Sequence, residues 1–357
     1  MGNGARTADA VDMIHKFVKK TNIPLLTTMN AVDIASDDLH IGFIGTHGNR
    51  IANLILRECD LIVSVGARLS IRQVGRYTAN FAPQAHLVRA DIDESELSRN
   101  IKSDEDKFHT DARDFMRKLL DEPVGDFSVW KKQCLEAKAV LAEYDQQPGN
   151  RAVEAIGALL PPNANVSVDV GMNQCWTAQS LVLKGYKGRI HISGGYGTMG
   201  CGLPFAIGSA IAKKDENVFC ITGDGGFQMN IQELETVKRE NLPIKIFILN
   251  NKVLGKISET QHFNHDNRFA ATAVSGGYTV PEFTKIAEAY GIRAVKLDSY
   301  EKLSMYKEWV NDNNPCLFDV SLPEMSFLTP KIKFETGKIS PDIEVSAIEK
   351  VKEILRA

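Results

Sequence analysis

The chain has no apolar run long enough to cross a bilayer and no excess of basic charge. Its 357 residues include 42 Lys and Arg against 45 Asp and Glu, a formal net charge of −3. A membrane-spanning helix needs about 20 consecutive apolar residues, and nucleic-acid binding relies on positive charge. We therefore expect neither a membrane nor a nucleic-acid partner, which leaves small molecules and other proteins.

Paired cysteine motifs are also absent. The six cysteines are scattered without a C-x-x-C pair, and we see no secretory leader before them. Several lie in apolar runs, where a reduced thiol packs well. They are Cys59, Cys134, Cys175, Cys201, Cys220 and Cys316. This usage is typical of a reducing compartment, so we expect a cytoplasmic protein.

Breaks in composition divide the chain. Alternating strand and helix patterns up to about residue 122 predict a first domain, and a charged helix-like connector covers 123–150. Residues 151–330 repeat the alternation, and 331–357 form a tail. We predict an α/β fold with two doubly wound, parallel-sheet domains. The patterns in the first domain are Ile23–Thr28, Ala52–Cys59, Leu61–Val65 and Leu87–Asp91.

The most informative motif is Gly223-Asp224-Gly225-Gly226, which follows an apolar strand pattern. A second buried-strand pattern ends at Asn250-Asn251. Parallel strands end on the same edge of a sheet, so Asp224 and Asn251 are expected to meet. Carboxylate and amide oxygens are ligands that Mg²⁺ accepts, and glycines let backbone amides approach a ligand. The sequence therefore predicts a diphosphate and metal site.

This spacing resembles the thiamin-diphosphate motif, which opens with Gly-Asp-Gly and closes with Asn-Asn. The resemblance implies that Asp224 and the Asn251 side chain bind Mg²⁺ and that Val253 supplies a backbone carbonyl. It also implies that the amides of Gly225 and Gly226, after Gly223, face the diphosphate of the cofactor. The alternative is a tight turn and an Asn-rich strand end that bind nothing.

A glycine-rich segment upstream admits two interpretations. Residues 195–200 fit the G-x-G-x-x-G template of dinucleotide-binding turns. A nicotinamide site needs a lone acidic residue after the next strand, which here ends in Gly-Asp-Gly instead. Residues 193–200 are similar to acetolactate synthases, which implies that the Gly197 carbonyl meets the cofactor's amino group and that Met199 supports the bent cofactor. The alternative makes Met199 a core residue.

A third segment, residues 169–176, resembles the other diphosphate loop of acetolactate synthase-like enzymes. Gly171 and Gln174 match that loop. Met172 and Asn173 stand where the family commonly has Gln and His, and the resemblance implies that Asn173 acts as an amide substitute. The alternative is a helix N-terminus that binds no ligand.

The first domain resembles the central domain of these enzymes, in which FAD lies along the strand ends. Three short segments carry that likeness, and they imply FAD contacts from His47, Gly66, Arg68, Asp91 and Asp93. A guanidinium pairs with a diphosphate, and a strand-end Asp accepts a ribose or ribityl hydroxyl. Alternatively, Asp93 caps a turn, Arg68 is solvated, His47 is a loop residue, and the domain is empty or takes another adenine nucleotide.

The resemblance implies decarboxylation of a 2-oxo acid such as pyruvate, with transfer to a second carbonyl. Enzymes of this family begin with a pyrimidine-binding domain whose glutamate activates the cofactor, whereas residues 2–6 look like the start of the central domain. Either the chain is a fragment or a separate polypeptide supplies that domain. We expect a homo-oligomer or a complementary pyrimidine-binding subunit as the protein partner, and the isolated chain to be inactive. Glu233 and Glu259 are expected to be solvated.

The sequence does not determine which acceptor substrate the pocket takes. Lys256 and Thr260 stand where acetolactate synthases usually carry Met and Trp. Residues 283–291 and Pro330-Lys331 look more like homologues of sugar and polysaccharide pathways, which would use a keto sugar. A simple 2-oxo-acid decarboxylase and a non-catalytic binding subunit are the alternative functions.

Overall fold

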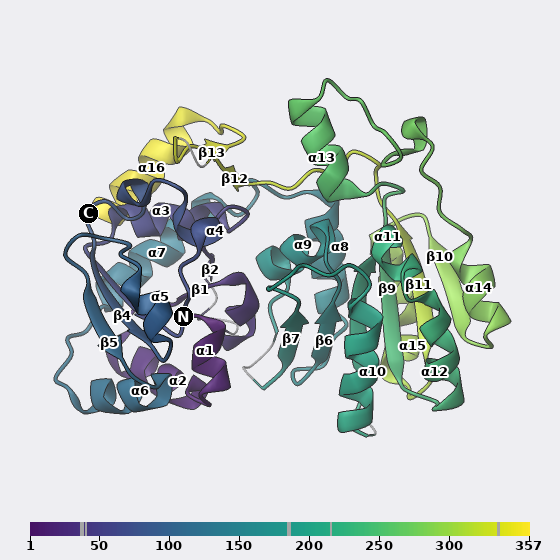
Figure 1. Ribbon diagram of the computed structural model, residues 1–357, viewed down its shortest axis with the longest axis horizontal. Coiled ribbons are helices and arrows are strands. Elements are labelled where there is room, and N and C mark those ends of the chain that lie inside the picture. The colour runs from purple at the N-terminus through teal and green to yellow at the C-terminus, as the bar shows by residue number, and fades with distance from the viewer. Residues whose placement is uncertain (36–38, 40, 184–186, 215, 334–335) are drawn as a thin grey trace. The chain divides into compact units, whose positions relative to one another are not determined.

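The structure is a computed structural model that describes residues 1–35, 39, 41–183, 187–214, 216–333 and 336–357. The chain forms two compact units. Unit 1 comprises Met1–Asp145 and Thr329–Ala357, and unit 2 comprises Gln146–Leu328. Both contain parallel sheets flanked by helices, which confirms the predicted α/β class (Figure 1).

Unit 1 contains two separate parallel sheets. One pairs β1 (Leu26–Thr27) with β2 (Gly42–Phe43), and the other has the order β3-β4-β5. Strand β1 is shorter than the predicted run from Ile23 because Pro24 has no N–H to give to a ladder. The remaining elements of residues 1–145 are α1 (Asn3–Thr7), α2 (Val11–Thr21), η1 (Met29–Ile34), α3 (Arg50–Glu58), β3 (Leu61–Val65), α4 (Ile71–Val74), η3 (Thr78–Asn80), β4 (His86–Asp91), α5 (Glu94–Ser98), β5 (Asp106–His109), α6 (Ala112–Asp121) and α7 (Ser128–Val140).

The C-terminal tail returns to complete unit 1. Its hairpin pairs β12 (Lys331–Ile332) with β13 (Ile339–Ser340), and α16 (Val345–Arg356) packs against α7 and α3. The apolar face of α16 buries Val351 and Leu355 in a cluster with Cys134. Arg50 bonds both carboxylate oxygens of Asp145, at 2.6 and 2.7 Å, and the Pro341 carbonyl at 2.8 Å. This buried guanidinium joins the tail to the first 145 residues.

Unit 2 is built on a six-stranded parallel sheet with the order β10-β11-β9-β8-β6-β7. The central strands β8 and β9 are buried along almost their whole length, as expected for a parallel sheet that helices cover on both faces. The central pair runs in register from Val218 opposite Ile244 to Gly223 opposite Leu249, so both strands end at the same edge. The elements are α8 (Pro148–Gly157), β6 (Asn165–Val168), α9 (Met172–Ser180), β7 (Arg189–Ile192), α10 (Gly202–Ala212), β8 (Val218–Gly223), α11 (Asp224–Gln228), η4 (Ile231–Glu233), α12 (Leu234–Arg239), β9 (Ile244–Asn250), α13 (Gly255–Asn264), η5 (Val274–Gly276), α14 (Phe283–Ala289), β10 (Arg293–Leu297), η6 (Tyr300–Tyr306), α15 (Lys307–Asn311) and β11 (Cys316–Ser321).

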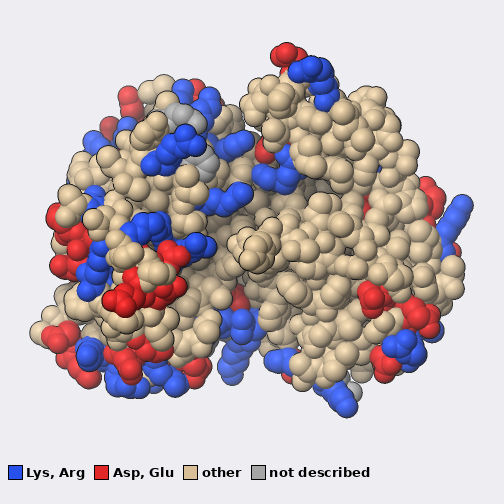
Figure 2. All heavy atoms as spheres, viewed as in Figure 1, with Lys and Arg blue, Asp and Glu red and all other residues tan. Residues whose placement is uncertain are grey.

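The molecular surface carries charges of both signs. On the face shown in Figure 2, basic and acidic side chains intermingle over unit 1, on the left of the view. No described helix combines the length and the apolar character needed to span a bilayer. The near balance of charge in the sequence is thus reproduced locally on this face.

Candidate cofactor and metal site

The predicted cofactor residues of unit 2 follow four neighbouring strands, with Gly197 and Met199 after β7 and the others at the ends of β6, β8 and β9. Asp169 follows β6, Asp224 follows β8 as the first residue of α11, and Asn251 follows β9. Because β6, β8 and β9 are adjacent and parallel, their three following loops share one edge of the sheet (Figure 1). Ligand sites of parallel sheets form at this edge.

Asp224 is the buried acid of the site, with only 1% of its surface exposed. One carboxylate oxygen accepts a hydrogen bond from the Lys252 N–H at 2.7 Å, and the other accepts one from the Tyr278 hydroxyl at 2.8 Å. Burial raises the pKa of Asp224 to about 6, although these donors and the backbone amides of Gly225 and Asn251 act to lower it. The structure thus brings Asp224 and Asn251 together.

The two asparagines at the end of β9, Asn250 as its last residue and Asn251 after it, have different surroundings. The amide of Asn250 donates to the Asp319 carboxylate on β11 at 2.8 Å, so this residue is held by the sheet. Lys252 adopts a left-handed conformation with φ of 58°, which turns the chain sharply between Asn251 and Val253. Non-glycine residues in this region are uncommon and cluster at functional sites. The turn keeps Asn251 beside Asp224.

A second buried carboxylate, Asp169, connects the loops of the site. Its Oδ1 accepts hydrogen bonds from the N–H of Val170 at 2.6 Å and of Gly200 at 2.8 Å, and its Oδ2 accepts one from the Thr222 hydroxyl at 3.1 Å. Burial raises the pKa of Asp169. One side chain therefore ties the loop after β6 to the glycine-rich segment and to the end of β8. Neither this role nor that of Tyr278 was anticipated from the sequence.

The glycines of the site are required by close packing. A Cβ on Gly226 would lie 2.7 Å from Oδ2 of Asp169, and one on Gly225 would lie 2.5 Å from Cδ2 of Leu254. Real Cβ atoms essentially never approach other atoms so closely. A side chain at either position would therefore displace Leu254 or Asp169, whereas glycine leaves the backbone accessible to a ligand.

The first turn of α9, which follows β6, contributes two amide side chains. Asn173 donates to the Asp169 carbonyl at 2.7 Å, and its Oδ1 lies 3.4 Å from where a Cβ of Gly223 would be. Asn173 thus fills the space between two loops. The Oε1 atom of Gln174 is buried and has no hydrogen-bond partner among the described residues. Buried side-chain acceptors are normally satisfied, so this atom suits a ligand that brings its own donor.

The glycine-rich segment lies over the Gly-Asp-Gly-Gly turn. The terminal methyl of Met199 is 3.7 Å from the position of a Cβ on Gly225, whereas Gly197 is exposed with φ of 66°. Tyr196 is fully exposed. Met199 therefore places an apolar side chain beside the turn, as a residue that supports a bound cofactor must do.

The chemistry of these donors fits the predicted ligands. Asp224 and Asn251 offer a carboxylate and an amide oxygen, the hard donors that Mg²⁺ takes, and Mg²⁺ commonly completes its octahedron with water and phosphate oxygens. Gly223 is the N-cap of α11 and Asp224 to Gly226 form its N-terminus, where N–H groups and the helix dipole favour an anion. A magnesium diphosphate is compatible with this edge of the sheet.

The expectation that Glu259 is solvated is wrong. Glu259 is only 2% exposed, not solvated. Its carboxylate accepts hydrogen bonds from the Leu328 N–H at 3.1 Å and from the Lys256 ammonium at 3.4 Å, and these partners make its burial tolerable. Glu233 is partly buried and accepts a hydrogen bond from the Thr236 hydroxyl at 2.9 Å. Glu259 thus holds a structural position on α13.

The predicted flavin residues of unit 1 lie after β2, β3 and β4. The Arg68 side chain is 73% exposed and pairs with Glu96 at 2.6 Å. Asp93 is the N-cap of α5 and accepts a hydrogen bond from the Ser95 N–H at 2.9 Å. Asp91 in turn accepts from the Asp93 N–H at 3.1 Å. His47 is buried, and Gly66 has φ of 57°.

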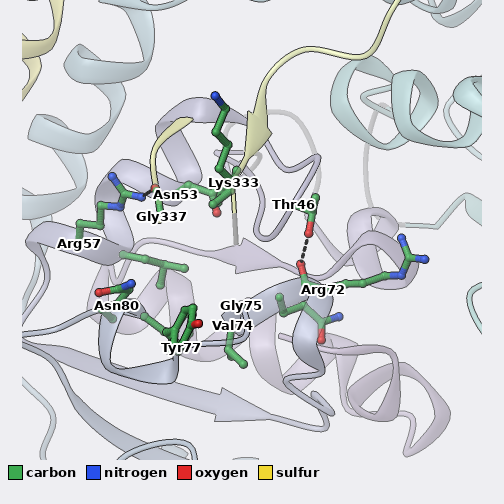
Figure 3. Close-up of a pocket in the computed structure, with 15 residues that line it drawn as sticks. Thr46, Asn53, Arg57, Arg72, Val74, Gly75, Tyr77, Asn80, Lys333 and Gly337 are labelled. Atoms are coloured by element: carbon green, nitrogen blue, oxygen red, sulfur yellow. Dashed lines mark hydrogen bonds between the residues drawn. The ribbon is translucent and has the colours of Figure 1, made fainter. Parts of the chain in front are cut away.

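Unit 1 also has a cleft that is lined by other residues. Figure 3 shows the basic side chains of Arg57, Arg72 and Lys333 among the residues that line it. Arg57 donates to the Gly337 carbonyl, and the Thr46 hydroxyl donates to the Arg72 carbonyl at 3.0 Å. His47, Gly66, Arg68, Asp91 and Asp93 are absent from the described lining of this cleft.

Two family descriptions match most of the chain. Residues 169–320 match the C-terminal TPP-binding domain of thiamine pyrophosphate enzymes, and residues 1–119 match the central domain of the same enzymes. The chain belongs to the thiamine pyrophosphate enzyme family. Thiamine pyrophosphate is thiamin diphosphate, so the family agrees with the resemblance that the glycine and asparagine motifs indicated.

Curated relatives of this thiamine pyrophosphate enzyme are acetolactate synthases. The chain is 30% identical over 343 residues to the acetolactate synthase isozyme 2 large subunit of Escherichia coli K12, which covers 93% of this chain and 61% of that protein. A probable acetolactate synthase large subunit of Methanocaldococcus jannaschii is 32% identical over 339 residues, 89% of this chain and 56% of that protein. The acetolactate synthase large subunit of Lactococcus lactis is 32% identical over 341 residues, with 93% and 58% covered. The chain thus spans less than two thirds of these relatives.

Proposed function

We propose that unit 2 binds thiamin diphosphate through a Mg²⁺ ion held by Asp224, Asn251 and the Val253 carbonyl. The proposed reaction is decarboxylation of a 2-oxo acid such as pyruvate, followed by transfer to a second carbonyl compound. The observation that carries the proposal is the convergence of three loops at one sheet edge, tied together by Asp169 and placed beside Asp224.

Each residue has a physical task in this proposal. The cofactor supplies the electron sink for decarboxylation. Asp224 offsets the charge of the metal, and the amides of Gly225 and Gly226 donate to phosphate oxygens. Gln174 gives its buried acceptor to the cofactor. Gly197 and Met199 orient the rest of the cofactor from the segment over the turn.

A further protein component belongs to the proposal. We infer that the activating glutamate comes from a pyrimidine-binding domain that is not among residues 1–357. Glu259 does not replace it, because its carboxylate is buried against the Leu328 N–H and the Lys256 ammonium. The isolated chain is accordingly expected to bind cofactor without turning over substrate.

Turnover measurements test this function. CO₂ release from pyruvate is measured in the presence of thiamin diphosphate and Mg²⁺. The pure chain is compared with the chain to which a pyrimidine-binding domain of an acetolactate synthase is added. That domain is supplied either as a separate protein or joined to Met1. We expect release only with the added domain. Saturable turnover by the chain alone would contradict the proposal that a pyrimidine-binding domain is needed for activity. Cofactor binding without turnover in every mixture would favour a non-catalytic binding subunit.

Product analysis separates ligation from simple decarboxylation. With an added domain and a second carbonyl compound present, the proposed reaction yields a coupled product, whereas a simple decarboxylase yields the aldehyde. Keto acids and keto sugars are the two acceptor classes to compare, because Lys256 and Thr260 stand where acetolactate synthases usually carry Met and Trp. A product that is aldehyde with every acceptor would replace the proposed reaction with decarboxylation.

A flavin in unit 1 is a separate proposal. It is supported by the exposed guanidinium of Arg68 after β3 and by Asp91 and Asp93 at the end of the adjacent β4. FAD is expected to raise the melting temperature, since a ligand of the folded state stabilises it. Arg68→Ala is expected to weaken FAD binding at least about tenfold through loss of a charged hydrogen bond.

Thermal shift and fluorescence titration with FAD test this prediction. Arg117→Ala is the matched control, because Arg117 is an exposed arginine of α6 that pairs with Asp114. Equal FAD affinity of the Arg68 and Arg117 variants would remove Arg68 from the site. If the purified protein is colourless and FAD does not change its melting temperature, the first domain binds no flavin.

A further inference from the structure

The Tyr278 hydroxyl bridges the two ends of α11. It donates to Oδ1 of Asp224, the first residue of that helix, at 2.8 Å. It also accepts a hydrogen bond from the side chain of Gln228, the last residue of α11. Residues four apart lie on the same face of a helix, so a single tyrosine reaches both. Because the Gln228 amide donates to the hydroxyl oxygen, the hydroxyl proton is directed at the carboxylate.

The carboxylate of Asp224 is held from two sides. Its Oδ2 accepts the N–H of Lys252 at 2.7 Å, so each oxygen has a donor from a different segment of the chain. Rotation of the carboxylate about its bond to Cβ would break at least one of these hydrogen bonds. Only 1% of Asp224 is exposed, so bulk water has little access to replace a lost donor. The plane of the carboxylate is therefore fixed by Lys252 and Tyr278.

The loop that carries Tyr278 is anchored beside the other proposed metal ligands. The carbonyl of Thr272, in the same loop, accepts hydrogen bonds from the Leu254 N–H at 2.8 Å and from the Ser258 hydroxyl at 3.0 Å. Leu254 directly follows residues 251–253 in the sequence, and Ser258 lies on α13. Tyr278 is thus tied to the segment that carries the remaining proposed ligands.

A fixed carboxylate favours Mg²⁺ over Ca²⁺. Mg²⁺ requires a near-ideal octahedron, whereas Ca²⁺ accepts more oxygen ligands in flexible geometry and binds a carboxylate through one oxygen or through both. The two hydrogen bonds of Asp224 restrict how far the carboxylate can turn to present both oxygens to one ion. Removal of the Tyr278 hydroxyl frees Oδ1, and the carboxylate can then adapt to either ion.

We propose that Tyr278 is a positioning residue that fixes the Asp224 carboxylate and thereby makes the site prefer Mg²⁺ to Ca²⁺. Groups that hydrogen-bond a metal ligand orient it, and their loss typically costs about 10- to 100-fold in metal affinity. Tyr278 acts through Asp224 and does not itself bind the metal. The inference rests on the proposed function, in which Asp224 is the carboxylate ligand, and goes further by naming the residue that selects the ion.

Calorimetric titration of the full chain with thiamin diphosphate, in the same excess of Mg²⁺ or of Ca²⁺, tests this inference. Tyr278→Phe keeps the aromatic ring and removes only the hydroxyl. We expect this variant to lose at least about tenfold in cofactor affinity with Mg²⁺ and less than about threefold with Ca²⁺. The ratio of the two affinities distinguishes positioning from a general loosening of the loop, which would weaken binding with both ions.

Tyr300→Phe is the matched control. Tyr300 is also half-buried, and its hydroxyl bonds the carboxylate of Glu301, which is not a proposed metal ligand. We expect Tyr300→Phe to leave the cofactor affinity unchanged with either ion.

Gln228→Met is a second variant, and it acts through the same hydroxyl. Met keeps the length of the side chain but cannot donate a hydrogen bond, so the hydroxyl proton loses its fixed direction. We expect a smaller loss of affinity with Mg²⁺ than in Tyr278→Phe. In the Tyr278→Phe background we expect Gln228→Met to have no further effect, because the effects of residues in one hydrogen-bond network are not additive.

Several results would overturn the proposal while leaving the proposed function intact. Equal losses with both ions in Tyr278→Phe would show a structural role only, and unchanged affinity with Mg²⁺ would show no role in binding. Tighter binding with Mg²⁺ would show that the hydroxyl, which lies 3.0 Å from the position of a Cβ on Gly225, obstructs the cofactor. Additive losses from the two substitutions would show that Gln228 does not act through Tyr278. If the native protein binds the cofactor with neither ion, the proposed function fails, and this inference fails with it.

Discussion

Asp224→Asn is expected to abolish Mg²⁺-dependent binding of thiamin diphosphate while making the cofactor-free protein more stable at neutral pH. Binding is lost because the site offers one carboxylate to the metal, and an amide carries no charge to offset that of Mg²⁺. Stability rises because the carboxylate is nearly fully buried. A neutral amide of the same shape avoids the cost of burying the charge.

The pKa of Asp224 determines whether its carboxylate raises or lowers the free energy of unfolding at a given pH. The pKa of Asp224 is raised from 3.8 to about 6 by burial. The folded state therefore holds the proton more tightly than the unfolded state, so stability falls as pH rises from about 4 to about 6. Two pKa units correspond to about 3 kcal/mol. Asn at this position should thus raise the free energy of unfolding by up to about 3 kcal/mol at pH 7.5 and by little at pH 4.

Calorimetry and chemical denaturation measure the two halves of this prediction. Thiamin diphosphate is titrated with and without Mg²⁺, and unfolding is followed at pH 4 and pH 7.5 without cofactor. Glu235→Gln is the control, since Glu235 is an exposed acid of the nearby α12. Unchanged cofactor affinity in Asp224→Asn would remove this residue as a metal ligand. A variant less stable than the native protein at pH 7.5 would contradict the burial argument.

Asp169→Ala is expected to lower both stability and cofactor affinity. The substitution leaves the N–H groups of Val170 and Gly200 and the hydroxyl of Thr222 without their acceptor. Each unsatisfied buried group costs about 1–3 kcal/mol, so the free energy of unfolding should fall by roughly 3–5 kcal/mol. Because these donors belong to separate loops, the cofactor site loses its common support.

The conservative variant Asp169→Asn separates the effect of the hydrogen bonds of Asp169 from the effect of its negative charge. Asp169→Asn keeps one acceptor oxygen for the two N–H groups, and its amide can donate to the Thr222 hydroxyl. We expect this variant to retain most of the stability and cofactor affinity that Asp169→Ala loses, as measured by denaturation and calorimetry. Equal losses in both variants would show that charge matters more than the hydrogen bonds. Equal cofactor affinity of Asp169→Ala and native protein would dismiss the positioning role.

The strand ends of unit 2 were predictable because apolar periodicity reports them directly. The runs ending at Thr222 and Leu249 are buried on both faces, and parallel pairing then requires Asp224 and Asn251 to share an edge. Local sequence and topology determine this part of the site. The helix after Cys201 was predictable for the same reason, since its apolar residues pack on the sheet.

The supports of the site were not predictable, because they depend on residues brought together from distant segments. Tyr278 lies 54 residues from Asp224, and no local pattern marks a tyrosine in a loop as the partner of a carboxylate. The burial of Glu259 depends on the Leu328 N–H, 69 residues away. Asp169 was visible as the start of a loop motif, but its bonds to Gly200 and Thr222 require the folded sheet.

The discontinuity of unit 1 has a consequence for synthesis on the ribosome. Residues 146–328 form unit 2 without interruption, so this unit can finish folding while the chain is still being made. Unit 1 begins earlier but lacks the β12–β13 hairpin and α16 until residues 331–356 have been made. Until then the apolar surface around Ile51 and Cys134 has no cover from Val351 and Leu355. Residues 1–145 are therefore made before unit 2 but reach their native packing after it, and their apolar surface is exposed to aggregation in the meantime.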